Sequence, residues 1–291
     1  MAYQTAYLKA HYPSEYMAAV LNHAGSIEKI TFFMEECKRM ELKVLGPDVN
    51  ESLKGFSVNK NGEIRFGLGG LKGVGDAAME AIITERNRGG HFTNMMDFMK
   101  RVLSRAVNKK SLESLAYSGS FDCFTEFHRA QYFNIAEGER IAGMEKLIAY
   151  AQAMQSITAG TTNTLFGDLP SAMQVPTPKI ASCEEWSLTE KLEHEKEITG
   201  MFMSGHPLDH FSFEMRHYQI TPINAFNEVK DHLALHTHHL GKNFKLAGLI
   251  TDVQHRVTKT GKNFGSFVIE DFTGKTDFIV DRKSTRLNSS H

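Results

Sequence analysis

The stretch Leu68–Ile83, LGGLKGVGDAAMEAII, is the part of the chain around which the rest is organised. It predicts a short apolar turn of helix, a Gly73-Val74-Gly75 hairpin, and a longer helix that begins at Asp76 or Ala77. Two glycines around one apolar residue let the backbone turn tightly and leave several N–H groups pointing outward. The following helix adds its own unpaired N–H groups and the positive end of its dipole. Such a feature suits a phosphate group.

Length, charge and cysteine content exclude several classes of protein. The 291 residues predict two or three domains. The 33 basic and 34 acidic residues exclude a global basic field, so any contact with nucleic acid must come from local patches. Cys37, Cys123 and Cys183 stand far apart without CxxC pairing, which argues against a disulfide framework or a thiolate zinc site and fits a reducing cytoplasm. Neither a membrane span nor a signal peptide is predicted.

The region on either side of the glycines predicts helices with one hairpin. The predicted elements before the glycines are helices over 2–24 with a break at Pro13 and over 27–40, a short strand over 41–45, and a hairpin over 55–68 with a two-residue turn at Asn61-Gly62. Those after them are helices over 79–87 and 94–102, and a second hairpin within 108–124, where a helix stops at Ser118-Gly119-Ser120 and Asp122 opens the next one.

The second half of the chain predicts a linker and a small sheet. We expect one long helical stretch over 129–155, a polar linker over 156–178 with an apolar island at Leu165-Phe166, and an acidic helix over 188–199. Strands are predicted over 246–250, 264–270 and 276–280, with a basic turn over 258–263. Three antiparallel strands cannot seal a barrel, so this unit is expected to be incomplete.

Positive charge gathers where the glycines are. Residues 54–110 hold eleven basic and five acidic side chains, in a chain that is otherwise close to neutral. This local excess favours a polyanionic partner for the Gly73 region.

Several motifs resemble the C-family replicative DNA polymerases, the catalytic alpha subunits of bacterial DNA polymerase III. The matching segments are Ala2–Pro13, Gly46–Asn50, Gly67–Glu80, Val107–Lys110, Ser118–Asp122, Gly200 with Ser204–Leu208, and Thr258–Gly261. They follow the family's order from Ala2 to Val280.

The resemblance implies a mixed α+β chain, mainly helical, with a tandem helix-hairpin-helix domain and a truncated OB-fold of antiparallel strands. The implied parts are the end of a fingers domain (1–55), the tandem helix-hairpin-helix domain (56–155), a linker with a clamp-binding-like motif (156–180), a helical connector (181–242) and the truncated OB-fold (243–280). Residues 281–291 match nothing in the family and resemble a translated sequencing adapter, so we expect them to be non-native.

The resemblance also implies a division of labour. The family's polymerising aspartates lie in an upstream palm domain, and its phosphoesterase-like domain lies further upstream; neither is in this sequence. We therefore expect no catalytic residue and no cofactor here, with Mg²⁺ belonging to the full-length enzyme. The implied partners are duplex and single-stranded DNA, the sliding clamp and other replicase subunits, in the cytoplasm and without a membrane.

Three groups of candidate site residues follow. Those for duplex DNA are Lys72, Gly73, Val74, Gly75, Lys109, Lys110, Ser118 and Gly119, whose backbone amides and ammonium groups suit phosphates and carry no base information. Those for single-stranded DNA are Lys259, Lys262 and Phe264. Those for the clamp are Thr162, Asn163, Thr164, Leu165 and Phe166, in a motif that usually begins with Gln.

Alternatives stay open at this point. Gly73 to Ala78 satisfies G-x-G-x-x-A, and Asp97 lies at about the distance of a ribose-binding carboxylate, so a dinucleotide-binding protein is one alternative. A stand-alone DNA-binding module is another. The glycine turn also fits a simple bend between packed helices, Leu165 and Phe166 fit a linker that docks back, and Phe264 fits a core position. The histidines at 232, 236, 238 and 239 form a weak metal motif without a nearby carboxylate or thiolate.

Overall fold

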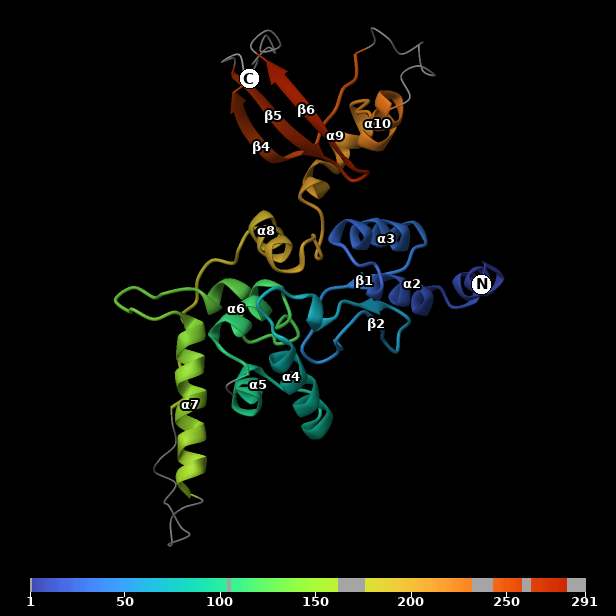
Figure 1. Cartoon of the computed structure of the whole chain (residues 1–291). Coiled ribbons are helices and arrows are strands. Elements are labelled where there is room, and N and C mark those ends of the chain that lie inside the picture. The colour runs from blue at the N-terminus through green and yellow to red at the C-terminus, as the bar shows by residue number, and fades with distance from the viewer. Residues whose placement is uncertain (1, 104–105, 162–175, 232–242, 258–262, 282–291) are drawn as a thin grey trace. The chain divides into compact units, whose positions relative to one another are not determined.

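The computed structural model describes residues 2–103, 106–161, 176–231, 243–257 and 263–281. The chain forms two compact units, Met1–Ser204 and Gly205–His291 (Figure 1). None of the helices in the described ranges combines the length and apolarity that a membrane span needs.

The first unit is mainly helical. Its elements are α1 (Ala2–His11), α2 (Pro13–Asn22), α3 (Ile27–Arg39), β1 (Val44–Leu45), β2 (Ser57–Val58), β3 (Ile64–Arg65), the 3-10 turn η1 (Leu68–Gly70), α4 (Asp76–Gly89), α5 (Met95–Val102), α6 (Lys109–Tyr117), the 3-10 turn η2 (Arg129–Tyr132), α7 (Gly143–Thr161) and α8 (Leu188–Thr199). The strands form a small sheet in the order β1-β3-β2, with β1 parallel and β2 antiparallel to β3.

The second unit combines short helices with a sheet. Its elements are η3 (Pro207–Phe211), α9 (Ser212–His217), α10 (Ile223–Asp231), β4 (Leu249–Val257), β5 (Asn263–Glu270) and β6 (Lys275–Asp281). The three strands are antiparallel in the order β4-β5-β6. The predicted mixed α+β fold class, with an OB-like set of strands after the helices, is confirmed.

Side-chain caps decide where the helices of the first unit begin. The Asn94 side chain accepts the N–H of Asp97 at 2.8 Å before α5, and Asn108 accepts the N–H of Ser111 at 3.0 Å before α6. Each cap satisfies an N–H group that the first helical turn leaves unpaired. These two caps hold α5 and α6 at fixed starts around the core.

One large core holds helices α4 to α7 together. It joins buried side chains of α4, α5, α6 and α7, among them Met79, Phe98, Leu112 and Leu147. The ring of Phe98 packs edge-on against Phe121 with centroids 5.0 Å apart, a favourable aromatic geometry. This core is the rigid support beneath the Gly73 turn, since Leu71 and Val74 belong to it.

In the second unit, α10 covers one face of the sheet. Phe267 and Phe278 stack across β5 and β6 with centroids 5.4 Å apart, and Phe278 stacks on Phe226 of α10 at 5.9 Å. The carboxylate of Asp271, which is buried, accepts the N–H of Ile223 at 2.9 Å at the start of α10. The helix and the sheet are thus fixed to each other.

The hairpin before the glycines differs from its prediction. The turn is a five-residue loop over 59–63 rather than a two-residue turn at Asn61-Gly62, and β2 and β3 are only two residues long. The side chain of Asn59 accepts the N–H groups of Asn61 and Glu63 at 2.9 and 3.0 Å, which stabilises the longer loop.

Several other predicted boundaries were wrong, among them that of the strand predicted over 41–45, which covers only Val44–Leu45. Residues 129–155 form η2, a loop and α7 rather than one helix; a Cβ on Gly143 would lie 2.2 Å from the carbonyl oxygen of Gln131, so the loop brings these two points close together. Asp122 does not open a helix; it lies in a turn, and its carboxylate pairs with Arg129. Residues 156–161 of the predicted linker are helical, and β4 covers 249–257 rather than 246–250.

Candidate nucleic-acid interface

The Gly73 turn has the geometry that the sequence predicts. Gly73 has φ +88°, in the left-handed region that favours glycine, and Gly75 is the extended residue that precedes α4. Leu71 and Val74 point into the core, whereas Lys72, Gly73 and Gly75 are exposed. The turn therefore presents backbone to solvent while its apolar residues anchor it.

The start of α4 carries N–H groups that the protein leaves unpaired. Within the part of the chain that the structure describes, the N–H groups of Gly75, Asp76 and Ala77 donate to no protein acceptor. Gly75 has no side chain to cap them, and α4 runs for 14 residues behind them. These N–H groups and the helix dipole favour an anion at this point.

The carboxylate of Asp76 pairs with a lysine and makes no side-chain cap bond to these N–H groups. Its Oδ1 atom lies 3.1 Å from Nζ of Lys54, and both side chains are exposed. The carbonyl of Lys54 also accepts the N–H of Gly69 at 2.9 Å, so Lys54 is fixed beside η1. Asp76 thus has a cationic partner and leaves the amides accessible.

Helix α6 packs directly against the turn and brings Lys110 to it. The hydroxyl of Ser111 donates to the carbonyl of Gly73 at 3.2 Å. A Cβ built on Gly73 would lie 2.4 Å from Oγ of Ser114 and 3.7 Å from Cε of Lys110. Lys110 therefore lies beside the turn, together with Lys72.

Lys109 is held by carboxylates instead. Its Nζ atom lies 2.6 Å from Oε1 of Glu145 and 3.7 Å from Oε1 of Glu113. The hydrogen bond to Glu145 raises the pKa of Lys109 above its usual value, although partial desolvation opposes the shift. In this structure Lys109 joins α6 to α7, so its charge is largely used within the protein.

The second predicted motif lies in the interior. Ser118 and Gly119 are buried, and Gly119 has φ +78°. A Cβ on Gly119 would lie 2.2 Å from Nη2 of Arg129, so the guanidinium covers the turn. The hydroxyl of Ser118 donates to the carbonyl of Leu115 at 3.0 Å. This placement argues against direct contact of Ser118 and Gly119 with a DNA backbone.

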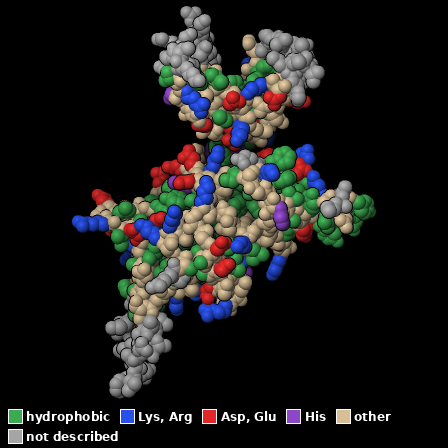
Figure 2. Space-filling view, viewed as in Figure 1, with side chains coloured by type: hydrophobic (Ala, Val, Ile, Leu, Met, Phe, Trp, Pro, Cys, Tyr) green, Lys and Arg blue, Asp and Glu red, His purple; other side chains and the backbone are tan. Residues whose placement is uncertain are grey.

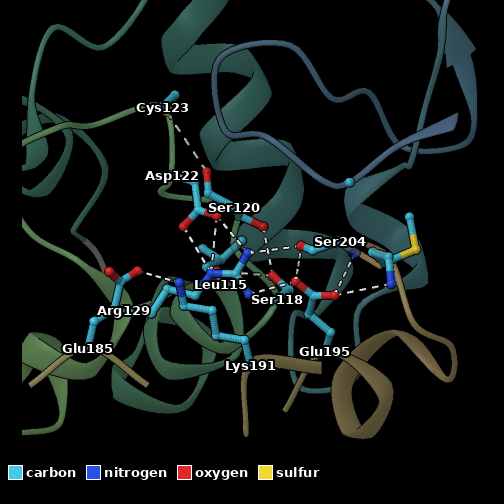
Figure 3. A network of polar contacts seen from close by, with 12 residues as sticks. Leu115, Ser118, Ser120, Asp122, Cys123, Arg129, Glu185, Lys191, Glu195 and Ser204 are labelled. Atoms are coloured by element: carbon cyan, nitrogen blue, oxygen red, sulfur yellow. Dashed lines mark hydrogen bonds and ion pairs between the residues drawn. The ribbon is translucent and has the colours of Figure 1, made fainter. Parts of the chain in front are cut away.

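Arg129 joins this second turn to α8, as Figure 3 shows. Its guanidinium contacts Asp122 at 2.6 Å and Glu195 at 2.7 Å. Burial alone would lower the pKa of Arg129, but the hydrogen bonds and charges of Asp122 and Glu195 raise it above its usual value. The guanidinium is therefore a permanent positive charge between two carboxylates.

Other predicted sites are only partly described. Thr162, Asn163, Thr164, Leu165 and Phe166, together with Lys259, Lys262 and the four histidines, lie outside the described residues. Phe264 pairs with Arg256 across β4 and β5. Because 264 and 267 differ by an odd number of residues, Phe264 lies on the opposite face of the sheet from Phe267, which belongs to the face that α10 covers. Phe264 and Arg256 line a shallow hollow on the other face of the sheet.

A metal centre finds no support in the described ranges. They hold no group of three or more His, Cys, Asp or Glu side chains placed to bind a metal ion.

Sequence reasoning missed residues that shape the candidate site. Ser111 and Ser114 pack on Gly73, and their spacing of three places two small side chains on one helix face. Lys54 was visible only as one of many basic residues, and Arg129 and Glu195 are too far apart in the sequence to suggest a pair.

Comparison with known proteins identifies the region. A helix-hairpin-helix motif matches residues 41–132. DNA polymerase III subunit alpha of Escherichia coli (strain K12) is 34% identical over 281 residues, which is 96% of this chain and 23% of that protein. This chain is homologous to part of DNA polymerase III subunit alpha. The alpha subunit of Campylobacter jejuni is 35% identical over 289 residues, and that of Vibrio cholerae is 32% identical over 282. The chain thus spans less than a quarter of the length of these alpha subunits.

Homology to the alpha subunit does not favour the dinucleotide alternative, and neither does the local structure. The glycines follow the 3-10 turn η1 rather than a strand, and α4 leads to the helix α5. Asp97 accepts the N–H of Thr93 and pairs with Arg101, each at 3.0 Å. Its carboxylate is used within α5 and its cap.

Proposed function

We propose that the helix-hairpin-helix region of this chain binds the backbone of duplex DNA at the Gly73 turn during chromosomal DNA synthesis. The observation that carries the proposal is the set of unpaired N–H groups at Gly75, Asp76 and Ala77, with Lys72 and Lys110 beside them. These groups can donate hydrogen bonds to phosphate oxygens, and such contacts do not depend on base sequence. The matched helix-hairpin-helix motif and the homology to a DNA polymerase subunit support this assignment.

The surface charge is compatible with a local contact rather than a broad one. On the face of the molecule in Figure 2, basic and acidic side chains are interspersed. A few ammonium groups at one turn therefore have to supply most of the salt-sensitive attraction.

We propose that the chain itself does not add nucleotides. The proposal is supported by the family resemblance, which implies that the polymerising aspartates and their Mg²⁺ belong to a palm domain outside this sequence. We therefore propose that this chain contributes to DNA-directed DNA synthesis by holding the duplex and not by adding nucleotides.

A second DNA contact is supported by the sheet of the second unit. Arg256 and Phe264 are neighbours on the face opposite α10, and an aromatic ring beside a cation suits a stacked base and its phosphate. Lys259 and Lys262 lie outside the described residues and are included in this proposal from the sequence and the family resemblance alone. We propose weak, sequence-tolerant binding of single-stranded DNA there.

Attachment to a sliding clamp through Thr162–Phe166, and contact with other replicase subunits, remain proposals from the resemblance. Alanine at both Leu165 and Phe166 is expected to abolish retention on the clamp of the same organism, whereas Thr162→Gln is expected to increase it. Unchanged retention in the double alanine variant would remove the assignment.

Three unpaired cysteines fit a reducing compartment, and we propose a cytoplasmic location.

The test of the main proposal is duplex binding by the whole chain. Fluorescence anisotropy with a labelled duplex is expected to show binding that weakens steeply with salt, and a primer-extension assay with Mg²⁺ and nucleotides is expected to show no synthesis. Absence of duplex binding at low salt would refute the proposed function.

A further inference from the structure

Helix α8 is remote from the Gly73 turn in the sequence but bonded to it in the fold. The backbone N–H of Lys72 donates to the carbonyl of Ile198 at 3.0 Å. Ile198 belongs to the same hydrophobic core as Leu71 and Val74, which anchor the turn. Because Lys72 immediately precedes the positive-φ Gly73, this hydrogen bond fixes the residue at which the turn begins.

A buried ion pair holds α8 in that position. Glu195 is fully buried, and its Oε1 atom lies 2.7 Å from Nη1 of Arg129, which is 7% exposed. Oε2 of Glu195 accepts the N–H groups of Met203 and Ser204 at 3.1 and 2.9 Å. Of these partners only Arg129 comes from outside α8 and the residues that follow it, so the ion pair ties α8 to the second turn, and loss of Arg129 would leave the buried carboxylate without its counter-charge.

The chain leading into α8 is also attached to the helix-hairpin-helix region. Trp186 stacks on Phe133 and Tyr117, with centroids 5.5 and 5.8 Å apart, and His194 of α8 lies 4.5 Å from the Trp186 ring. Side chains of the region before it also bind the backbone of this segment. Lys146 donates to the carbonyl of Lys179 at 3.3 Å, and Gln131 donates to that of Ala181 at 3.2 Å. The ring of His128 lies within hydrogen-bond distance of the carbonyl of Cys183, at 3.1 Å. Trp186, the single tryptophan of the chain, thus reports on whether this segment is docked.

We propose that α8 sets the geometry of the DNA-binding turn, with Arg129 and Glu195 as positioning residues that touch no DNA. This inference rests on the proposed function of the Gly73 turn. Docked α8 supplies the acceptor for the Lys72 amide and so keeps the turn in the conformation that binds DNA. When α8 is displaced, the turn loses this hydrogen bond, and DNA binding has to order it at a cost in affinity. Docking of α8 and binding of duplex DNA are therefore coupled, and each strengthens the other.

The test uses the whole chain with Glu195→Gln, and with Glu193→Gln as the matched control, since Glu193 is exposed on the same helix. In the free protein, hydrogen exchange at the Lys72 amide is expected to accelerate in Glu195→Gln, with Trp186 emission shifted to the red. Duplex affinity is expected to fall about tenfold with an unchanged salt slope, because the phosphate contacts stay the same. The control is expected to match the native chain in all three measurements.

A double variant guards against a folding defect. Arg129→Met with Glu195→Met removes both charges and keeps apolar packing, which often preserves stability; it is expected to restore the Lys72 protection and the duplex affinity. Lost affinity in the double variant with native Trp186 emission would overturn the inference, since Arg129 would then act on DNA directly. Unchanged affinity in Glu195→Gln despite faster Lys72 exchange would overturn it as well. Failure of the native chain to bind duplex DNA would instead refute the proposed function, while the exchange measurements would still report on the coupling to α8.

Discussion

The ammonium group of Lys54 lies 3.1 Å from the carboxylate of Asp76 at the first residue of α4. A carboxylate at this point of a helix competes with any external anion for the same amides. Among the described residues the Asp76 carboxylate pairs with Lys54 and accepts none of these N–H groups, so they stay open to an external anion. The pair is exposed, and its own contribution to stability is therefore small.

Substitution of the two partners should change DNA affinity in opposite directions. Asp76→Asn removes a negative charge beside the amides and is expected to strengthen duplex binding about threefold at low salt. Lys54→Ala removes a cation and releases Asp76 to cap the helix, so binding should weaken. Anisotropy titrations at a fixed salt concentration measure both effects, with Glu80→Gln, an exposed position further along α4, as the control. Two changes of the same sign would show that the pair does not control access to the turn.

Gly73→Ala should destabilise the first unit, because Gly73 has φ +88° and its new Cβ would lie 2.4 Å from Oγ of Ser114. The expected loss is about 2 kcal/mol in the free energy of unfolding. Gly75→Ala is the matched control, since Gly75 has φ −76° and a Cβ added there would have no atom within 4 Å. Urea unfolding followed by circular dichroism gives both values, and equal stabilities would contradict the role of Gly73.

Lysine substitutions should separate phosphate contacts from structural pairs. Lys72→Ala and Lys110→Ala are each expected to reduce the salt slope of duplex binding by about 0.9. Lys109→Ala should change the slope less, because Glu145 and Glu113 already bind that ammonium group. An equal loss of slope for Lys109 would mean that DNA displaces Glu145.

Acid should destabilise the first unit through its paired carboxylates. The hydrogen bond from Lys109 lowers the pKa of Glu145, and that from Arg88 lowers the pKa of Glu85. A carboxyl group whose pKa is depressed in the folded state contributes stability above its unfolded pKa and loses it as pH falls through the folded value. The urea concentration at the unfolding midpoint should therefore decrease as the pH is lowered below about 4.3, which is the ordinary pKa of Glu. With Glu145→Gln the fall should be smaller, and an unchanged acid response would contradict the pairing.

Local patterns predicted much of the fold. The bounds of α8 agree with the predicted 188–199, because Ser187 and Glu190 form a capping box and Gly200 ends the helix with φ +85°. The Gly73 turn was predictable for the same reason, since the residues that shape it are adjacent in the sequence. The failures lie where distant residues decide the structure.

The turn at Ser118-Gly119 shows why the rest could not be predicted. Its sequence suggests an exposed hairpin like that at Gly73, but Arg129 covers it and binds Glu195 of α8. No local sequence pattern predicts a buried ion pair between residues so far apart. The same is true of the hydrogen bond from the N–H of Lys72 to the carbonyl of Ile198. The sequence therefore indicated both turns, but not that distant residues bury the second one.

The most direct test of phosphate binding at the Gly73 turn is the salt dependence of duplex binding by the native chain and by Lys72→Ala. We predict a linear fall of log K with log salt concentration, and a slope smaller by about 0.9 in the variant. Binding that is insensitive to salt, or a slope that Lys72→Ala leaves unchanged, would contradict the claim that the Gly73 turn holds the phosphate backbone.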